Sequence, residues 1–185
     1  MKESSTLYFI AIIPPESVKN ELTSFKEDFA KRFQSKKALN IVPHITLKIP
    51  FRVDNKEHDT LLKWFVDLDL NVRPFNIRLD GFGSFMRRGQ PIVFVRPVAT
   101  DDLTALQKNL IIKMESDFPD YVDKDDHSFT PHMTIAYRDL DRSVYKQAWK
   151  EYKSKKYEAE FHVNRIALLM HNSKVWNVMS EQHLA

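Results

Sequence analysis

The chain has 185 residues, and its hydrophobic content of 43 % is enough to fill the core of one large domain or of two joined lobes. Its formal net charge is only +3, because 28 Lys and Arg residues are mixed with 25 Asp and Glu residues, and this balance excludes a basic stripe for gripping long nucleic-acid duplexes. The absence of cysteine and the presence of only three glycines exclude disulfides, thiolate zinc sites, cysteine nucleophiles and glycine-rich phosphate loops.

The sequence contains no apolar run close to the ~20 residues of a membrane-spanning helix. The apolar run near its beginning is too short for a secretory signal and is ended by a charged residue. We therefore expect a soluble, cytoplasmic protein with no membrane partner.

The first half of the chain predicts five elements. Residues 7–13 are β-branched, aromatic or aliphatic and end at a pair of prolines, which indicates a buried strand. In residues 16–33, apolar side chains recur at three- and four-residue steps, the pattern of an amphipathic helix. A strand at 41–51, a short helix around 61–68 and a long strand from 75 towards 85 complete this half.

The second half repeats that order. PIVFVRP, residues 91–97, predicts a strand, and the next segment, 101–118, predicts a helix that opens with aspartate at its N-cap. TPHMTIAYRDL, residues 130–140, predicts another strand. A helix at 142–152, a strand at 158–170 and a last strand at 174–179 follow.

No linker separates the two halves, since RRGQP at residues 87–91 is only a turn between two strand-like runs. We therefore expect one domain, residues 1–185, with two lobes related by a pseudo-twofold axis. The class is α+β: each lobe has a mainly antiparallel sheet with helices packed outside, and an active-site cleft lies between the lobes.

One short pattern occurs twice, as PHITL at residues 43–47 and as PHMTI at residues 131–135. With the composition of this chain, His-φ-[Ser/Thr]-φ, where φ is apolar, is expected by chance only about 0.14 times. In a strand, residues i and i+2 face the same side, so His44 lies beside Thr46 and His132 beside Thr134. The apolar residues between them anchor each strand to a core, and the polar pairs are expected to face a cleft.

The two histidines allow two other interpretations. A single histidine on a strand is usually structural, but packing gives no reason to repeat the same polar pair on two strands. Two histidines could also bind one metal ion, but neither motif contains Asp, Glu or Cys, and threonine is a poor zinc ligand. Acid/base catalysis by the two histidines is therefore the favoured interpretation, and we expect no metal and no cofactor.

On these two motifs the chain resembles the 2H phosphoesterase superfamily, which includes bacterial 2′–5′ RNA ligase-like proteins and cyclic nucleotide phosphodiesterases. The signature of that superfamily is a pair of His-φ-[Ser/Thr]-φ motifs, and residues 44–47 and 132–135 match it. The resemblance implies a bilobed α+β fold. It also implies metal-independent action on 2′,3′-cyclic or 2′–5′ phosphodiester bonds of RNA ends or nucleotides, or on cyclic phosphates of related metabolites.

Such a reaction needs one group that accepts a proton and another that donates one from the opposite side of the phosphorus. His44 and His132 would take these two catalytic roles, in an order that the sequence does not assign. Thr46 and Thr134 would donate hydrogen bonds to the non-bridging phosphate oxygens.

Four further residues are candidates for substrate binding. Lys48 shares the face of the first motif if its strand is regular, while Arg88 at the turn and Arg138 after the second motif would add positive charge. Tyr137 could stack on a base. The remaining histidines match no motif and are expected to be structural or exposed: His58, His127, His162, His171 and His183.

A non-catalytic alternative stays open, in which the two histidines only bind the phosphate of an RNA end or a nucleotide. The modest net charge argues against broad affinity for RNA but not against recognition of one terminal phosphate. In either case we expect a monomer whose partner is an RNA end or a small cyclic nucleotide or phosphate ester.

Overall fold

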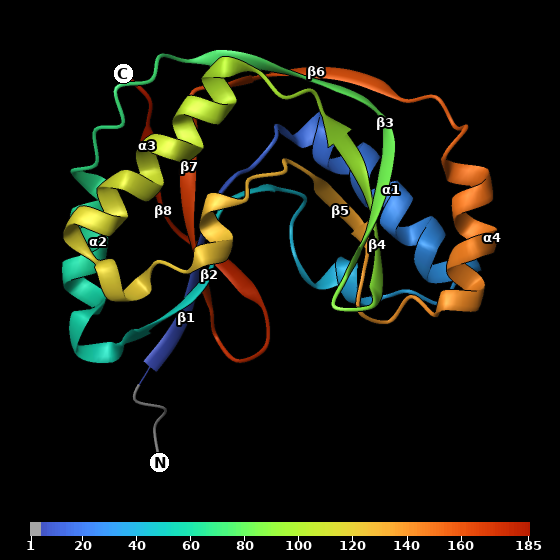
Figure 1. The fold of residues 1–185 in the computed structure, drawn as a ribbon, viewed down its shortest axis with the longest axis horizontal. Coiled ribbons are helices and arrows are strands. Elements are labelled where there is room, and N and C mark those ends of the chain that lie inside the picture. Colours follow the sequence, from blue (N-terminus) through green and yellow to red (C-terminus); the bar gives the residue numbers. More distant parts are fainter. Residues whose placement is uncertain (1–4) are drawn as a thin grey trace.

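Two four-stranded sheets form the framework of residues 5–185, the part of the chain that the computed structural model describes (Figure 1). Sheet A has the order β2-β1-β7-β8 and consists of β1 (Ser5–Ile12), β2 (Ile45–Asp54), β7 (Arg165–His171) and β8 (Trp176–His183). Sheet B has the order β5-β4-β3-β6 and consists of β3 (Phe75–Arg87), β4 (Gln90–Pro97), β5 (Met133–Ala136) and β6 (Glu158–Val163). All neighbouring strands are antiparallel, so the predicted α+β class is confirmed.

Two helices pack against each sheet. Sheet A is in contact with α2 (His58–Val66) and α3 (Asp101–Asp117), and sheet B with α1 (Glu16–Arg32) and α4 (Arg142–Tyr152). Short 3-10 helices occupy four connections: η1 (Lys37–Asn40), η2 (Asn55–Glu57), η3 (Pro119–Tyr121) and η4 (Lys124–His127). Within residues 5–185, no helix is both long and apolar enough to cross a bilayer.

The two lobes do not coincide with the two halves of the sequence. The helix α1 follows β1 of sheet A but packs on β5 of sheet B, and α3 follows β4 of sheet B but packs on β2 of sheet A. The antiparallel pair β3–β6 runs across the top of the molecule in Figure 1 and joins the lobes. Each lobe is therefore completed by elements from the other half of the chain.

The two faces of sheet A bury different clusters of side chains. Tyr8, Ile10 and Ile12 of β1 belong to the main hydrophobic core, while Phe9 and Ala11 face the other way. A second, smaller cluster forms on that other face, and its members are Phe9, Ala11, Ala167 and Leu169. Because both faces are apolar, β1 reads as a continuous hydrophobic run in the sequence.

Two predictions about these elements are wrong. The strand predicted at 158–170 is two strands in different sheets, β6 and β7, which separate at Asn164. The N-cap of α3 is Thr100 and not an aspartate, because its hydroxyl accepts a hydrogen bond from the backbone N–H of Leu103 at 3.2 Å. No proline or glycine interrupts residues 158–170, so the sequence alone did not reveal the change of sheet.

Candidate active site

A cleft with a volume of about 590 Å³ is lined by residues of both sheets. Both predicted His-Thr pairs line it, with His44 and Thr46 next to sheet A and His132 and Thr134 next to sheet B. Three of the four additional candidates also line it, namely Arg88, Tyr137 and Arg138. The structure thus brings together residues that are 88 positions apart in the sequence.

The two histidines are held in the same local way. Each precedes the first residue of an edge strand, β2 or β5. Nδ1 of His44 lies 2.7 Å from the carbonyl oxygen of Val42, and Nδ1 of His132 lies 2.7 Å from that of Thr130. A carbonyl oxygen can only accept, so Nδ1 carries the hydrogen and Nε2 is the basic atom of each neutral ring.

Aromatic rings pack against both imidazoles, which are half-buried in the wall of the cleft. The ring centroid of Phe9 is 4.9 Å from that of His44, and the ring centroids of Phe85 and Phe94 are 5.2 and 5.5 Å from that of His132. Burial in such surroundings disfavours the charged imidazolium. The tilted contact with Phe9 orients the ring of His44, and the two edge-on contacts orient the ring of His132.

Burial lowers the pKa of His44 to about 4, and the positive charges of Lys26 and His132 add to this effect while the hydrogen bond to Val42 opposes it. Burial also lowers the pKa of His132 below its ordinary value, with the charge of Arg87 acting in the same direction. In the free protein both rings are therefore neutral at pH 7.

The two threonines lie two residues after their histidines, as the strand period requires. Thr46 pairs with Ala11 of β1, and Thr134 pairs with Phe94 of β4, so backbone pairing fixes the position of each. Within residues 5–185, neither hydroxyl makes a hydrogen bond to another protein group. Both hydroxyls are thus available to a ligand in the cleft.

Arg88 lies at the tip of the β3–β4 hairpin. The backbone pairing runs up to Arg87 and Gln90, so Arg88 and Gly89 form a two-residue turn, in which their φ angles are 49° and 78°. Two positive φ angles are typical of the type I′ turn, whose first position favours Asn or Gly. Arg142 of α4 donates to the carbonyl oxygen of Gly89 from Nε at 2.8 Å and Nη2 at 2.5 Å, and so holds this tip in place.

Tyr137 and Arg138 form a tight turn directly after β5. The N–H of Asp139 donates to the carbonyl oxygen of Tyr137 at 2.7 Å across Arg138, whose φ is 63°. The guanidinium carbon of Arg138 lies 5.2 Å from the centroid of the Tyr137 ring. Among the described residues, neither Arg88 nor Arg138 has an acidic partner, so both keep their charge for a ligand.

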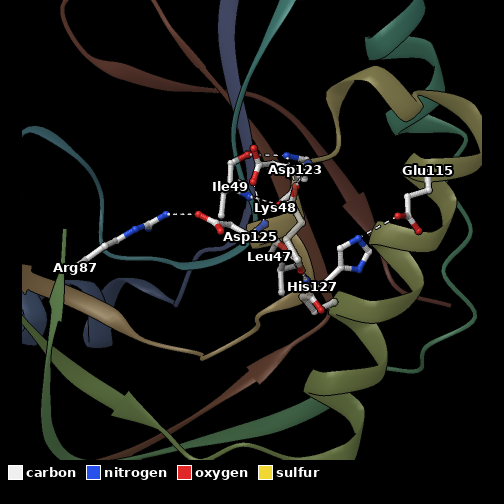
Figure 2. Close-up of polar contacts among 10 residues, drawn as sticks. Leu47, Lys48, Ile49, Arg87, Glu115, Asp123, Asp125 and His127 are labelled. Carbon is white, nitrogen blue, oxygen red and sulfur yellow. Dashed lines mark hydrogen bonds and ion pairs between the residues drawn. The ribbon is translucent and has the colours of Figure 1, made fainter.

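Lys48 does not line the cleft, because its strand is not regular as the prediction assumed. The pairing of β2 with β1 shifts on both sides of Lys48, which turns its side chain to the core face. There it is fully buried, its Nζ is 3.0 Å from Oδ2 of Asp126, and it lies over the ring of Phe51. Figure 2 shows its surroundings. Lys48 belongs to a buried ion pair, not to the wall of the cleft.

Arg87, His171 and Trp176 also line the cleft, although they were not among the predicted site residues. Arg87 precedes the hairpin tip and reaches Asp125 of η4 at 3.6 Å (Figure 2). His171, which was expected to be structural or exposed, and Trp176 lie at the two ends of the β7–β8 connection and line the cleft. No sequence pattern marks this pair, because only the fold brings the end of the chain beside the first motif.

No acidic side chain lines the cleft in the described part of the chain. Residues 5–185 also contain no group of three or more His, Cys, Asp or Glu side chains arranged to hold a metal ion. The polar groups of the cleft are therefore imidazole, hydroxyl, amide and guanidinium, which favour an anionic ligand.

A bilobed α+β fold with one His-Thr pair on each wall of its cleft defines the class of two-histidine phosphoesterases. The chain belongs to the 2′–5′ RNA ligase superfamily, whose family profile matches residues 14–174. The predicted resemblance is thereby confirmed.

Individual relatives agree with this assignment. A protein of Geobacillus kaustophilus, described as a "putative phosphoesterase", is 30% identical over 162 residues, which cover 88% of this chain and 86% of the relative. Among solved structures, LigT of E. coli in complex with 3′-AMP has a TM-score of 0.70 at 15% identity and covers 98% of this chain and 99% of its own. TT0787 of Thermus thermophilus has a TM-score of 0.65 at 20% identity, with 96% and 97% coverage.

Proposed function

We propose that the protein is a metal-independent phosphoesterase that cleaves 2′,3′-cyclic or 2′–5′ phosphodiester bonds of RNA ends or nucleotides by two-histidine acid/base catalysis. The observation that carries this proposal is the pair of Nδ1-anchored imidazoles, each with an unpartnered threonine hydroxyl, on the two walls of one cleft. Superfamily membership and the phosphoesterase relatives support the same reaction class.

The reaction is an in-line displacement at phosphorus. Nε2 of one neutral imidazole takes a proton from water while the water oxygen bonds to phosphorus. The other ring is charged as an imidazolium, and its Nε2–H protonates the ribose oxygen as the bond of that oxygen to phosphorus breaks. Thr46 and Thr134 hydrogen-bond the non-bridging oxygens, and Arg88 and Arg138 neutralise their charge. Tyr137 lies beside Arg138 and contacts the sugar or base.

The depressed pKa values favour His44 as the base and His132 as the acid. His44, with its pKa near 4, stays neutral over the whole working range, as a base must. A phosphate between the rings raises the pKa of a neighbouring imidazole, because an opposite charge stabilises the imidazolium. We assign the acid to His132, whose pKa is lowered by burial and by the charge of Arg87 while its hydrogen bond to Thr130 acts in the opposite direction.

The nature of the ligand is supported by a structural neighbour. LigT of E. coli has been crystallised with 3′-AMP and with phosphate. A nucleotide phosphate matches the imidazole, hydroxyl and guanidinium groups of the present cleft, which contains no acidic side chain among the described residues. We therefore take a nucleotide or RNA end as the substrate class.

The decisive experiment is hydrolysis of 2′,3′-cyclic nucleotides and of RNA with a cyclic-phosphate end in the presence of EDTA. His44→Ala and His132→Ala are each expected to lower kcat by roughly 10²–10⁴-fold. His162→Ala is the matched control, because His162 is exposed, hydrogen-bonds Asn76 of β3 and does not line the cleft. Unchanged turnover in both cleft variants would refute the proposal.

A non-catalytic role is the second candidate. It is favoured by the burial of both imidazoles, which lowers their pKa and makes each ring a less ready proton donor. Calorimetric binding of 3′-AMP and of cyclic-phosphate RNA separates the two functions. Tight binding without turnover over the whole substrate panel, from pH 4 to 8, identifies a binding module. Turnover that depends on both histidines identifies the enzyme.

A further inference from the structure

The two walls of the cleft differ in chemistry. The wall formed by sheet B contributes all three arginines that line the cleft in the described residues, Arg87, Arg88 and Arg138. The wall formed by sheet A contributes no arginine or lysine, and instead carries Phe9, His171 and Trp176. An anionic ligand with a flat apolar part would match both walls at once, with its charge at sheet B and its flat part at sheet A.

Trp176 is the largest side chain on the aromatic wall, and its ring is held by neighbours on two sides. Its centroid lies 4.6 Å from that of Phe9 at an interplanar angle of 88°, and 5.0 Å from that of His171 at 60°. Both contacts are edge-to-face, so they fix the indole without covering it by a parallel ring. The side chain is only partly buried and lines the cleft.

The position of this indole relative to the reacting groups is set by one intervening ring. Phe9 contacts Trp176 on one side and His44 on the other, with centroid distances of 4.6 and 4.9 Å. A single benzene ring therefore lies between Trp176 and the imidazole, so the indole and His44 are close neighbours in the same wall of the cleft. The backbone pair His171–Trp176 closes the β7–β8 hairpin and fixes this arrangement.

We propose that Trp176, together with His171, forms a subsite that stacks the nucleobase of the nucleotide whose phosphate lies between His44 and His132. This inference rests on the proposed function, and it narrows the substrate from cyclic phosphates in general to those that carry a base. Aromatic side chains stack on every base through its flat face, so the subsite selects for a base without specifying which one. The remaining phosphates of a longer substrate then extend towards the arginines of sheet B.

A fluorescence titration tests the subsite without requiring turnover. The chain has three tryptophans, so the double variant Trp64→Phe/Trp149→Phe leaves Trp176 as the only indole. We expect saturable quenching on addition of 3′-AMP and no quenching by inorganic phosphate at saturating concentration. Quenching by both ligands or by neither would overturn the stacking subsite.

Steady-state kinetics provide an independent measurement. Trp176→Ala should raise KM for 2′,3′-cyclic AMP roughly 5- to 150-fold, the range for loss of one stacked base, and should leave kcat nearly unchanged. Glycerol 1,2-cyclic phosphate has no base, so the wild type and Trp176→Ala should hydrolyse it equally. Trp176→Phe keeps a flat ring and should restore most of the affinity, and Trp149→Phe in α4 is the matched control.

The outcomes separate the subsite from the proposed reaction. Saturable quenching by 3′-AMP with no turnover of any substrate supports the subsite and refutes the enzymatic function. Equal loss of activity on the base-containing and base-free substrates in Trp176→Ala refutes the subsite, while the His44→Ala and His132→Ala results still decide the reaction. A Trp176→Ala protein that fails to fold leaves Trp176→Phe and the titration as the deciding tests.

Discussion

Burial acts on both cleft histidines, and it sets the pH range in which they exchange protons. As the base, His44 must be neutral, so kcat/KM should rise with pH through about 4, its pKa in the free protein. As the acid, His132 must be charged, so kcat/KM should fall as pH rises through a pKa that burial keeps below 6.5. The profile is expected to be a bell with its maximum on the acid side of neutrality. A flat profile from pH 5 to 9, measured where chemistry limits the rate, would contradict the acid/base pairing.

Lys26 lies outside the cleft but also influences the pH profile, because its charge acts on His44. Its side chain is 2 % exposed, its Nζ donates to the carbonyl oxygen of Ile41 at 2.7 Å, and no ion pair neutralises it within residues 5–185. Burial lowers the pKa of Lys26 to about 8, so it is charged at neutral pH and disfavours a charge on His44.

Lys26→Met should therefore raise the pKa of His44, which NMR titration of its ring protons measures directly. Lys19→Met is the matched control, since Lys19 belongs to the same helix but is paired with Glu16 at the surface.

The pH dependence of the free energy of unfolding provides a second measurement of the charge on Lys26. The folded-state pKa of Lys26 is depressed, so the unfolded chain binds more protons between about pH 8 and 10.5, and the wild type gains stability over that window. Lys26→Met should lack this gain, and an unchanged His44 pKa would rule out the influence.

At the scale of elements, Arg88 occupies a turn position of the β3–β4 hairpin at which the backbone conformation favours Asn or Gly. A left-handed conformation costs an ordinary side chain about 1 kcal/mol, and Arg88 adopts it with φ of 49°. Arg88→Asn should therefore stabilise the fold by about 0.5–1 kcal/mol in urea unfolding. Because Arg88 is proposed to bind phosphate, the same change should raise KM about tenfold.

Gln34→Asn provides the comparison for this prediction. Gln34 also has a positive φ, 55°, but it does not line the cleft. It should show the stability gain without the change in KM. A gain in stability for both variants together with unchanged KM in Arg88→Asn would mean that Arg88 does not contact the substrate.

The elements also show what the sequence could and could not predict. Local signals are sufficient for α4, whose bounds of Arg142–Tyr152 agree with the prediction, and for the turn at Arg88. The side-chain direction of Lys48 depends on irregular pairing with β1, which is a contact between distant segments. Trp176 reaches the cleft only because β7 lies beside β1. The spacing of apolar residues along the sequence carries no information on the direction of Lys48 or on the position of Trp176.

At the scale of the whole molecule, Asp139 connects the two motif-bearing segments. It follows β5, and its carboxylate accepts hydrogen bonds from the Ser35 hydroxyl at 2.8 Å and from the N–H groups of Lys36 and Lys37 at 2.8 and 3.0 Å. Those residues begin the segment that leads through η1 to His44. The carboxylate thus fixes the approach of one histidine loop relative to the other.

Asp139→Ala should lower stability by about 2 kcal/mol, as expected for lost hydrogen bonds to a charged group, and should lower kcat about tenfold through misplacement of His44. Asp141→Ala is the control, because it removes the N-cap of α4 at a cost of about 1 kcal/mol but does not touch the segment before His44. Activity is compared well below both unfolding temperatures. Equal kcat in the two variants would limit Asp139 to a purely stabilising role.

The exchange of helices between the lobes determines whether fragments of the chain can fold on their own. A polypeptide ending at the β3–β4 turn would contain β1 and β2 without the helix that covers them, and α1 without the sheet on which it packs. Neither fragment holds a complete hydrophobic interior, so each alone should be unfolded, whereas the two produced together should assemble into an intact protein. The cut ends would lie at an exposed loop, and the imidazoles would meet only after the pieces had found each other.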